Sequence, residues 1–180
     1  MLNKLFILLF VLFITGCSTF YRISDKTHNQ YVRPDAIDNN FDITGRFFIQ
    51  NTTNIQYGNF AWNKTGTHEI LTFNTPLGQT VAKITIESSD AILDTGQKVY
   101  TGSNLDALML NNLGFSIPIE YLHYWIQGVT FPNINVDNQN EFGFTQLGWT
   151  IEYLEWYDHN HPKVIKISKN DVVIKLLVQW

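Results

Sequence analysis

The most regular pattern in the chain is an alternation of apolar and polar residues that begins at Phe41. In the segment Phe41–Gln50 every second position is apolar or glycine, and Asp42, Thr44 and Arg46 lie between them. Successive side chains of a β-strand point to opposite faces of a sheet, so this spacing places the apolar residues on one face. The pattern predicts a strand with one buried face and one face in water.

Similar short runs recur along the chain, separated by turn formers such as Gly66 and Gly96. They predict further strands at 55–63, 68–73, 79–87, 91–93, 98–100, 142–146, 149–157, 163–168 and 172–180. A tight turn at Lys169-Asn170 is expected to join the last two strands. Residues 131–140 show no sustained pattern, and we expect a loop there.

Between residues 103 and 128 the apolar spacing changes from two to three or four, which predicts helices. The first follows a candidate N-cap at Ser103 or Asn104 and ends near Gly114. The second begins at Pro118, which suits a first helical turn, and ends before Gly128. Strands, two adjacent helices and more strands predict an α+β fold, in which helices cover the concave face of a curved antiparallel sheet.

The first sixteen residues have the pattern of a secretory signal peptide. Lys4 precedes an unbroken apolar stretch, Leu5–Ile14, and small residues follow it. A membrane-spanning helix needs about 20 apolar residues, and this stretch is shorter. We therefore expect residues 1–16 to be removed.

The sequence Ile14-Thr15-Gly16-Cys17 resembles the lipobox of bacterial lipoproteins, which implies cleavage before Cys17 and acylation of that cysteine. It is the only cysteine in the chain, so no intrachain disulfide can form. Ser18, rather than Asp, follows it, which by the sorting pattern of lipoproteins favours the outer membrane, facing the periplasm. Residues 17–40 are polar and contain Pro34, so we interpret them as a tether with room for one short helix.

Charge and composition limit the classes of partner that the folded segment, residues 41–180, can bind. The chain has 12 basic and 16 acidic residues, and loss of Lys4 with the signal changes the formal charge from −4 to −5. A nucleic-acid partner therefore has no electrostatic support. Aromatic residues make up 14% of the chain, so many large rings must fill a core or line a cavity.

No established catalytic motif is present, and we expect neither an enzyme nor a bound cofactor. The segment Asp158-His159-Asn160-His161 places two imidazoles two positions apart, as a metal site could. Pro162 follows and the neighbours are polar, which favours a solvated turn over a metal site.

The segment Thr75-Pro76-Leu77-Gly78 joins two predicted strands. Pro76 at the second position and Gly78 at the fourth fit a type I turn, which places Leu77 at an exposed tip. A single exposed leucine is common in soluble proteins. On a membrane-tethered protein it could also enter the lipid interface.

Several segments, in this order, make the chain resemble the LolB family of outer-membrane lipoprotein receptors. Besides the lipobox, the resemblance rests on Phe41–Phe47, Phe60–Trp62, Thr75–Gly78, Ile117–Ile119, Tyr124–Gly128 and Ile174–Leu176. It implies an incomplete, half-open β-barrel with a helical lid over an apolar cavity that accepts acyl chains. Leu77 matches the family's protruding leucine, so Pro76, Leu77 and Gly78 are the expected membrane-insertion loop.

The candidate residues for the wall of the acyl-chain cavity are large apolar side chains from strands and helices alike. They are Phe47, Phe60, Trp62, Ile84, Leu108, Trp125, Ile126, Trp149 and Leu176. Each could equally belong to an ordinary core.

The resemblance implies a receptor that takes acylated client lipoproteins from the periplasmic carrier LolA and inserts them among outer-membrane phospholipids. We expect it to act as a monomer, without nucleotide or covalent chemistry. Two alternatives stay open: an envelope lipoprotein that binds other lipids or apolar ligands, and an anchored accessory protein or enzyme whose site is not recognisable in the sequence.

Overall fold

The computed structural model describes Pro34 and residues 36–88, 90–158 and 160–180. The expected signal peptide, Cys17 and most of the expected tether lie outside the described residues. The hydrophobic core extends from Phe41 to Val178. A chain that starts at Ser18 therefore keeps every core residue and has what a domain needs to fold by itself.

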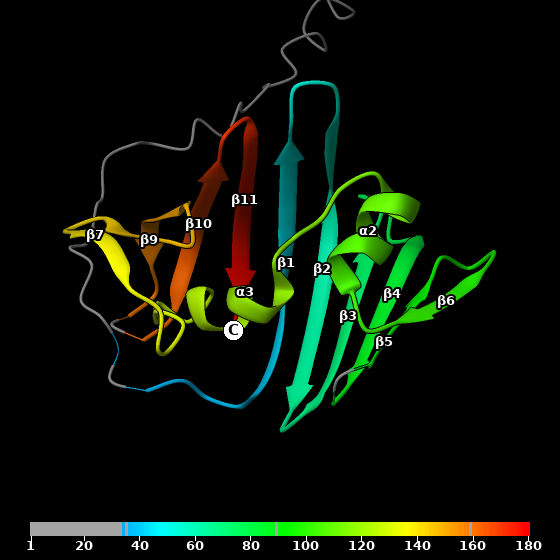
Figure 1. Cartoon of the computed structure of the whole chain (residues 1–180), viewed down its shortest axis with the longest axis horizontal. Coiled ribbons are helices and arrows are strands. Elements are labelled where there is room, and N and C mark those ends of the chain that lie inside the picture. The colour runs from blue at the N-terminus through cyan, green and yellow to red at the C-terminus, as the bar shows by residue number, and fades with distance from the viewer. Residues whose placement is uncertain (1–33, 35, 89, 159) are drawn as a thin grey trace, which may run out of the picture.

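The described strands form a single antiparallel sheet of eleven strands, in the order β6-β5-β4-β3-β2-β1-β11-β10-β9-β8-β7 (Figure 1). Their bounds are β1 Asn40–Gln50, β2 Ile55–Thr65, β3 His68–Asn74, β4 Thr80–Glu87, β5 Asp90–Asp94, β6 Val99–Gly102, β7 Val136–Asn140, β8 Gly143–Gln146, β9 Trp149–Trp156, β10 Pro162–Lys169 and β11 Val172–Gln179.

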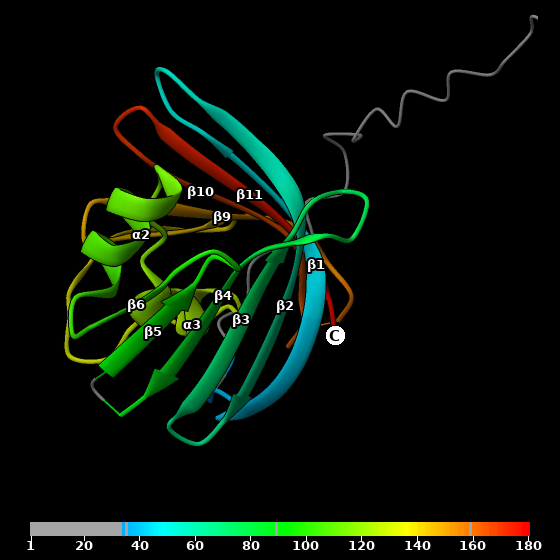
Figure 2. The ribbon, with the colours of Figure 1, turned by 90° about the vertical axis from the view of Figure 1, so that its right-hand side faces the viewer.

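The central pair of the sheet, β1 and β11, joins the two ends of the folded segment. Phe47 lies opposite Leu176 in this antiparallel register. Every other pair of described strands joins neighbours in sequence, so the sheet consists of two meanders that meet at β1 and β11. The outermost strands, β6 and β7, do not pair with each other, and the curved sheet stays an open half-barrel (Figure 2).

Two helices, α2 (Leu105–Leu113) and α3 (Ile119–Trp125), connect β6 to β7 and lie within the curve of the sheet (Figures 1 and 2). Asn104 is the N-cap of α2, because its side-chain oxygen accepts a hydrogen bond from Ala107 N at 2.9 Å. Gly114 ends α2 in the left-handed conformation, with φ 77°. The predicted α+β fold, with a curved antiparallel sheet and a helical lid, is confirmed.

Two glycines of the central strands make room for aromatic rings on the concave face. Gly45 of β1 lies opposite Phe60 of β2, and Gly58 lies opposite Phe47. A Cβ atom on Gly45 would lie 2.7 Å from the Phe60 ring, and one on Gly58 would lie 3.1 Å from the Phe47 ring. Each ring therefore lies over a strand that carries no side chain at that point.

Three local predictions were wrong in detail. Residues 131–140 do not form only a loop, because β7 occupies Val136–Asn140; it is a polar edge strand that pairs with β8 alone. The second helix is shorter than expected and ends at Trp125, three residues before Gly128. The last hairpin turns one residue later than predicted, because Lys169 still belongs to β10 and Asn170 has φ 53°.

Replacement of Trp125 by alanine should strongly destabilise the fold. The side chain is fully buried, and its Nε1 donates a hydrogen bond to Gln146 Oε1 at 3.1 Å. We expect Trp125→Ala to lower the free energy of unfolding by about 3–5 kcal/mol, measured by urea denaturation. Trp180→Ala, at a partly exposed ring, should cost only about 1 kcal/mol, the usual net value of one hydrogen bond. Equal costs at the two positions would contradict this assignment of the core.

Candidate functional site

The interior of the half-barrel, between the sheet and the helical lid, is apolar and almost filled. An internal cavity of about 20 Å³ remains there, lined by ten apolar side chains. These are Phe47, Phe60, Trp62, Leu71, Phe73, Ile117, Ile119, Leu122, Ile126 and Leu176. Such a volume has room for about one water molecule, whereas ligand pockets are usually about 300–1,000 Å³. An acyl chain therefore needs space outside this cavity or a displacement of its walls.

The sequence candidates for the cavity wall divide into two groups. Phe47, Phe60, Trp62, Ile126 and Leu176 line the internal cavity. The other four lie elsewhere: Ile84 and Trp125 are fully buried in the surrounding core, Leu108 packs at its edge, and Trp149 lines a different pocket.

Sequence reasoning missed five residues of the cavity wall: Leu71, Phe73, Ile117, Ile119 and Leu122. Two of them carried a usable signal. Leu71 lies opposite Trp62 and Phe73 opposite Phe60 in the β2–β3 register, so a hairpin at Gly66 already places them on the same face.

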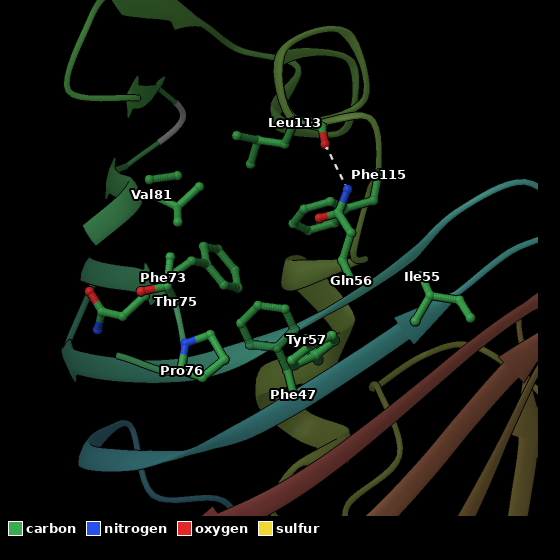
Figure 3. Close-up of a pocket in the computed structure, with 12 residues that line it drawn as sticks. Phe47, Ile55, Gln56, Tyr57, Phe73, Thr75, Pro76, Val81, Leu113 and Phe115 are labelled. Atoms are coloured by element: carbon green, nitrogen blue, oxygen red, sulfur yellow. Dashed lines mark hydrogen bonds between the residues drawn. The ribbon is translucent and has the colours of Figure 1, made fainter. Parts of the chain in front are cut away.

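A larger apolar space, the mouth pocket, opens at one end of the half-barrel and has a volume of about 250 Å³ (Figure 3). Its wall contains no charged side chain and consists of Phe47, Ile55, Gln56, Tyr57, Phe73, Asn74, Thr75, Pro76, Val81, Ala82, Leu113 and Phe115. Phe47 and Phe73 line both this pocket and the internal cavity, and their rings meet edge to face with centroids 5.5 Å apart. These two rings separate the pocket from the cavity.

The connection between α2 and α3, counted here from the last residue of α2 (residues 113–118), forms the lid side of the mouth pocket. Gln56 Nε2 of β2 donates a hydrogen bond to the carbonyl oxygen of Leu113 at 3.1 Å (Figure 3). The Phe115 ring packs edge to face on Phe73, with centroids 6.0 Å apart. One side-chain hydrogen bond and one ring contact thus join the connection to the β2–β3 hairpin.

The β3–β4 loop projects from the rim of the mouth pocket. Gly78 N donates to the carbonyl oxygen of Thr75 at 2.9 Å, and Gly78 has φ 87°, a conformation that favours glycine. Thr75 and Pro76 line the pocket, whereas Leu77 is 98% exposed. The predicted exposed tip is confirmed.

Three further apolar side chains near this loop are exposed: Ile55, Tyr57 and Val81. All three also line the mouth pocket (Figure 3). Large exposed apolar patches are rare on soluble monomers and are typical of surfaces that bind proteins, apolar ligands or membranes. The wall of the mouth pocket therefore carries exposed apolar side chains, and the loop that holds Leu77 begins in the same wall, at Thr75 and Pro76.

Buried polar groups lie at the opposite end of β3 from this rim. Lys64 Nζ lies 2.5 Å from Glu69 Oε1, and Trp62 Nε1 donates to Glu69 Oε2 at 3.1 Å. Nearby, the pKa of His123 is lowered to about 4, because burial disfavours the imidazolium; Lys64 also lowers it, while Glu69 opposes the shift. Lys64, Glu69 and Trp62 thus satisfy one another, whereas the buried Nδ1 of His123 has no hydrogen-bond partner among the described residues. None of these side chains lines the mouth pocket.

The segment considered as a metal site forms a local turn. His161 Nδ1 lies 2.8 Å from both carboxylate oxygens of Asp158, and this hydrogen bond is the main cause that lowers the Asp158 pKa. His159 lies outside the described residues. Among the described residues, no three histidine, cysteine, aspartate or glutamate side chains gather as a metal site requires. No helix in the described part of the chain has the length and apolarity to span a membrane.

Comparison with known proteins gives one consistent result. A family model described as "Outer membrane lipoprotein LolB" matches residues 39–180. The outer-membrane lipoprotein LolB of Chromobacterium violaceum is 24% identical, over 99% of this chain and 98% of its own length. Proteins of the same name from Nitrosomonas europaea and Cupriavidus metallidurans are 27% and 36% identical, over 81% and 56% of this chain and 74% and 52% of their own lengths.

The lowered pKa of His123 predicts a loss of stability in mild acid. The unfolded chain binds a proton near pH 6.5 and the folded chain only near pH 4, so the free energy of unfolding should fall as the pH drops through that interval. We expect the urea midpoint to decrease between pH 7 and pH 5, and to decrease less in His123→Gln.

His68→Gln, the same replacement at a more exposed histidine, is measured beside it as the control. The carboxyl groups whose pKa is lowered, Asp158 and Asp171, lose their stabilising effect only at more acidic pH, below this window. An unchanged pH dependence in His123→Gln would refute the assignment.

Proposed function

The chain belongs to the LolB family, and on that premise we propose that it is an outer-membrane receptor for lipoproteins. It receives acylated lipoproteins from the periplasmic carrier LolA and releases them into the outer membrane. Cys17, acylated after removal of residues 1–16, anchors it there on the periplasmic side, and residues 17–40 tether the domain 41–180. No catalytic step or cofactor is needed.

The observation that carries this proposal is the position of an uncharged pocket beside an exposed leucine. The mouth pocket shares Phe47 and Phe73 with the apolar interior, and Pro76 on its rim directly precedes Leu77. An acyl chain in the pocket therefore lies next to the part of the surface best suited to contact lipid. The relatives share the name of an outer-membrane lipoprotein, which supports the same function.

Transfer through such a site is passive. Exposure of apolar surface to water costs roughly 25 cal/mol per Å², so a long acyl chain does not leave one apolar site unless another receives it. The carrier, the mouth pocket and the bilayer provide three such sites in sequence. Net movement requires that the chain bind more tightly at each step, and the bilayer, which takes up all the acyl chains, is the final site.

The proposed membrane step depends on the β3–β4 loop. Pro76 limits the backbone on one side of Leu77, and the Thr75–Gly78 hydrogen bond closes the turn. The tip is therefore rigid enough to keep its leucine in contact with lipid. Contact at this point places the mouth of the pocket against the bilayer, so the client moves into lipid without crossing water.

Substitution of the loop leucine should separate acceptance from delivery. We expect the Leu77→Glu chain from Ser18 onward to accept an acylated lipoprotein from loaded LolA as the native chain does. A leucine in the lipid interface contributes about 1.5–3 kcal/mol, so delivery to liposomes should be roughly ten- to a hundredfold slower. Delivery is measured as the client that floats with liposomes over time.

Val99→Glu is the matched control, because Val99 is also exposed but lies on β6, away from the loop and the mouth pocket. It should deliver the client at the native rate. If neither variant nor the native chain accepts client from LolA, the receptor function is wrong, and lipid that copurifies with the chain becomes the next ligand to identify. If Leu77→Glu delivers normally, the role of the loop is wrong.

A further inference from the structure

The connection between α2 and α3, residues 113–118, borders three separate spaces. Leu113 and Phe115 line the mouth pocket, and Ile117 lines the internal cavity. On its other side lies a space of about 480 Å³, here named the second pocket. Its apolar wall includes Ile49, Leu110, Phe115, Leu147, Trp149 and Val172. Phe115 thus belongs to the walls of both outer pockets.

The mouth pocket by itself is small for the proposed cargo. Its volume of about 250 Å³ lies below the range of about 300–1,000 Å³ that is usual for ligand pockets. A lipoprotein that is stably anchored carries at least two lipid chains, because one chain binds membranes only marginally. A receptor for such clients needs space for more than one chain. The second pocket is larger than the mouth pocket, and its wall is mixed, because Asn51, Asp106, Ser116 and Lys169 line it beside the apolar side chains.

We propose that the second pocket is a second acyl-chain subsite, and that Phe115 is the movable partition between it and the mouth pocket. This inference rests on the proposed function, because it assigns space to a second chain of the same client. When the connection moves, the two pockets and the internal cavity become one site. Trp149, which sequence reasoning placed in the cavity wall, then contacts the cargo from the second pocket.

The contacts of the connection suit such a movement. The Gln56–Leu113 hydrogen bond holds its first residue, and Ser116 Oγ donates to Asp106 Oδ1 at 2.9 Å near its middle. Both bonds use side chains at the surface or half-buried, so water can replace either partner. An acyl chain that displaces the Phe115 ring replaces the Phe73 contact with apolar surface of its own, which keeps the cost of opening low.

The side chains of the second pocket also suit the end of an acyl chain at which an ester or amide group joins it to the client. Trp149 and Val172 provide apolar surface, while Asn51 and Lys169 provide hydrogen-bond donors beside it. Lys169 Nζ donates to the carbonyl oxygen of Leu147 at 3.0 Å and lies 5.7 Å from the centre of the Trp149 ring. An ammonium group has three protons, so Lys169 can also bind an ester or amide carbonyl of the client.

A brominated fatty acid tests the proposal directly, since bromine quenches tryptophan fluorescence only at close range. Stearic acid brominated at mid-chain is titrated into the chain from Ser18 onward, and into Trp149→Phe. Trp149 lines the second pocket and is absent from the wall of the mouth pocket. We expect the quenched fraction of the fluorescence to fall clearly in Trp149→Phe, because the ring next to the bound chain is then no longer a tryptophan.

Val172→Phe provides the second variant, because it fills the second pocket from β11. Loss of room for about two methylene groups should raise the dissociation constant of the fatty acid roughly tenfold. Val99→Phe, the same change on the exposed edge strand β6, should leave it unchanged. Urea midpoints confirm that both variants are folded. Acceptance of client from loaded LolA is measured on the same variants and should fall only in Val172→Phe.

The outcomes separate this inference from the proposed function. If client is accepted and neither Trp149→Phe nor Val172→Phe differs from the native chain, the second subsite is wrong and the receptor function stands. If the native chain accepts no client, the receptor function itself fails, whatever the fatty acid does. A further outcome is that the fatty acid fails to bind although the native chain accepts client. In that case the subsite is overturned if Val172→Phe accepts client as well as the native chain does, and it is supported if Val172→Phe accepts less.

Discussion

The pairing of β1 with β11 is the contact on which the rest of the structure depends. All other described strand pairs join sequence neighbours, so each meander could form its hairpins alone, but neither could enclose an interior. The register between β1 and β11 sets Phe47 opposite Leu176, and both side chains line the internal cavity. A shift by one residue would place Phe47 and Leu176 on opposite faces of the sheet, so that one of the two strands would no longer contribute to the cavity wall.

Aromatic rings that lie over glycines shape the interior between the sheet and the helical lid. Phe60 covers Gly45 and Phe47 covers Gly58, so bulky side chains fit between the strands and the helical lid without forcing them apart. The result is an interior nearly closed by its own side chains. Such closure favours folding, because a large apolar cavity open to water would leave apolar surface exposed.

The buried polar groups lie apart from the mouth pocket and the internal cavity. The Lys64–Glu69 pair lies at the end of β3 remote from the Leu77 loop. Gln146, also buried, bonds Trp125 and the backbone of residues 131 and 134 with all of its side-chain groups. The buried Lys64, Glu69 and Gln146 side chains are thus satisfied within the protein, whereas the buried Nδ1 of His123 has no hydrogen-bond partner among the described residues.

The sequence by itself determined the features that depend on a few neighbouring residues. Alternation in Phe41–Gln50 set the buried face of β1, and Pro76 with Gly78 set an exposed Leu77. A cap at Ser103 or Asn104 and a stop at Gly114 set the ends of α2 to within one residue. In each case the backbone geometry of a strand, cap or turn restricts which residue types can occupy the position.

Only the tertiary structure decided which large side chains line a cavity and which fill the core. Trp62 and Trp125 look alike in sequence, yet one lines the cavity and the other does not, because their places depend on how the lid packs against the sheet. The same holds for β7, a polar segment with no strand pattern of its own, whose extended form comes from its hydrogen bonds to β8.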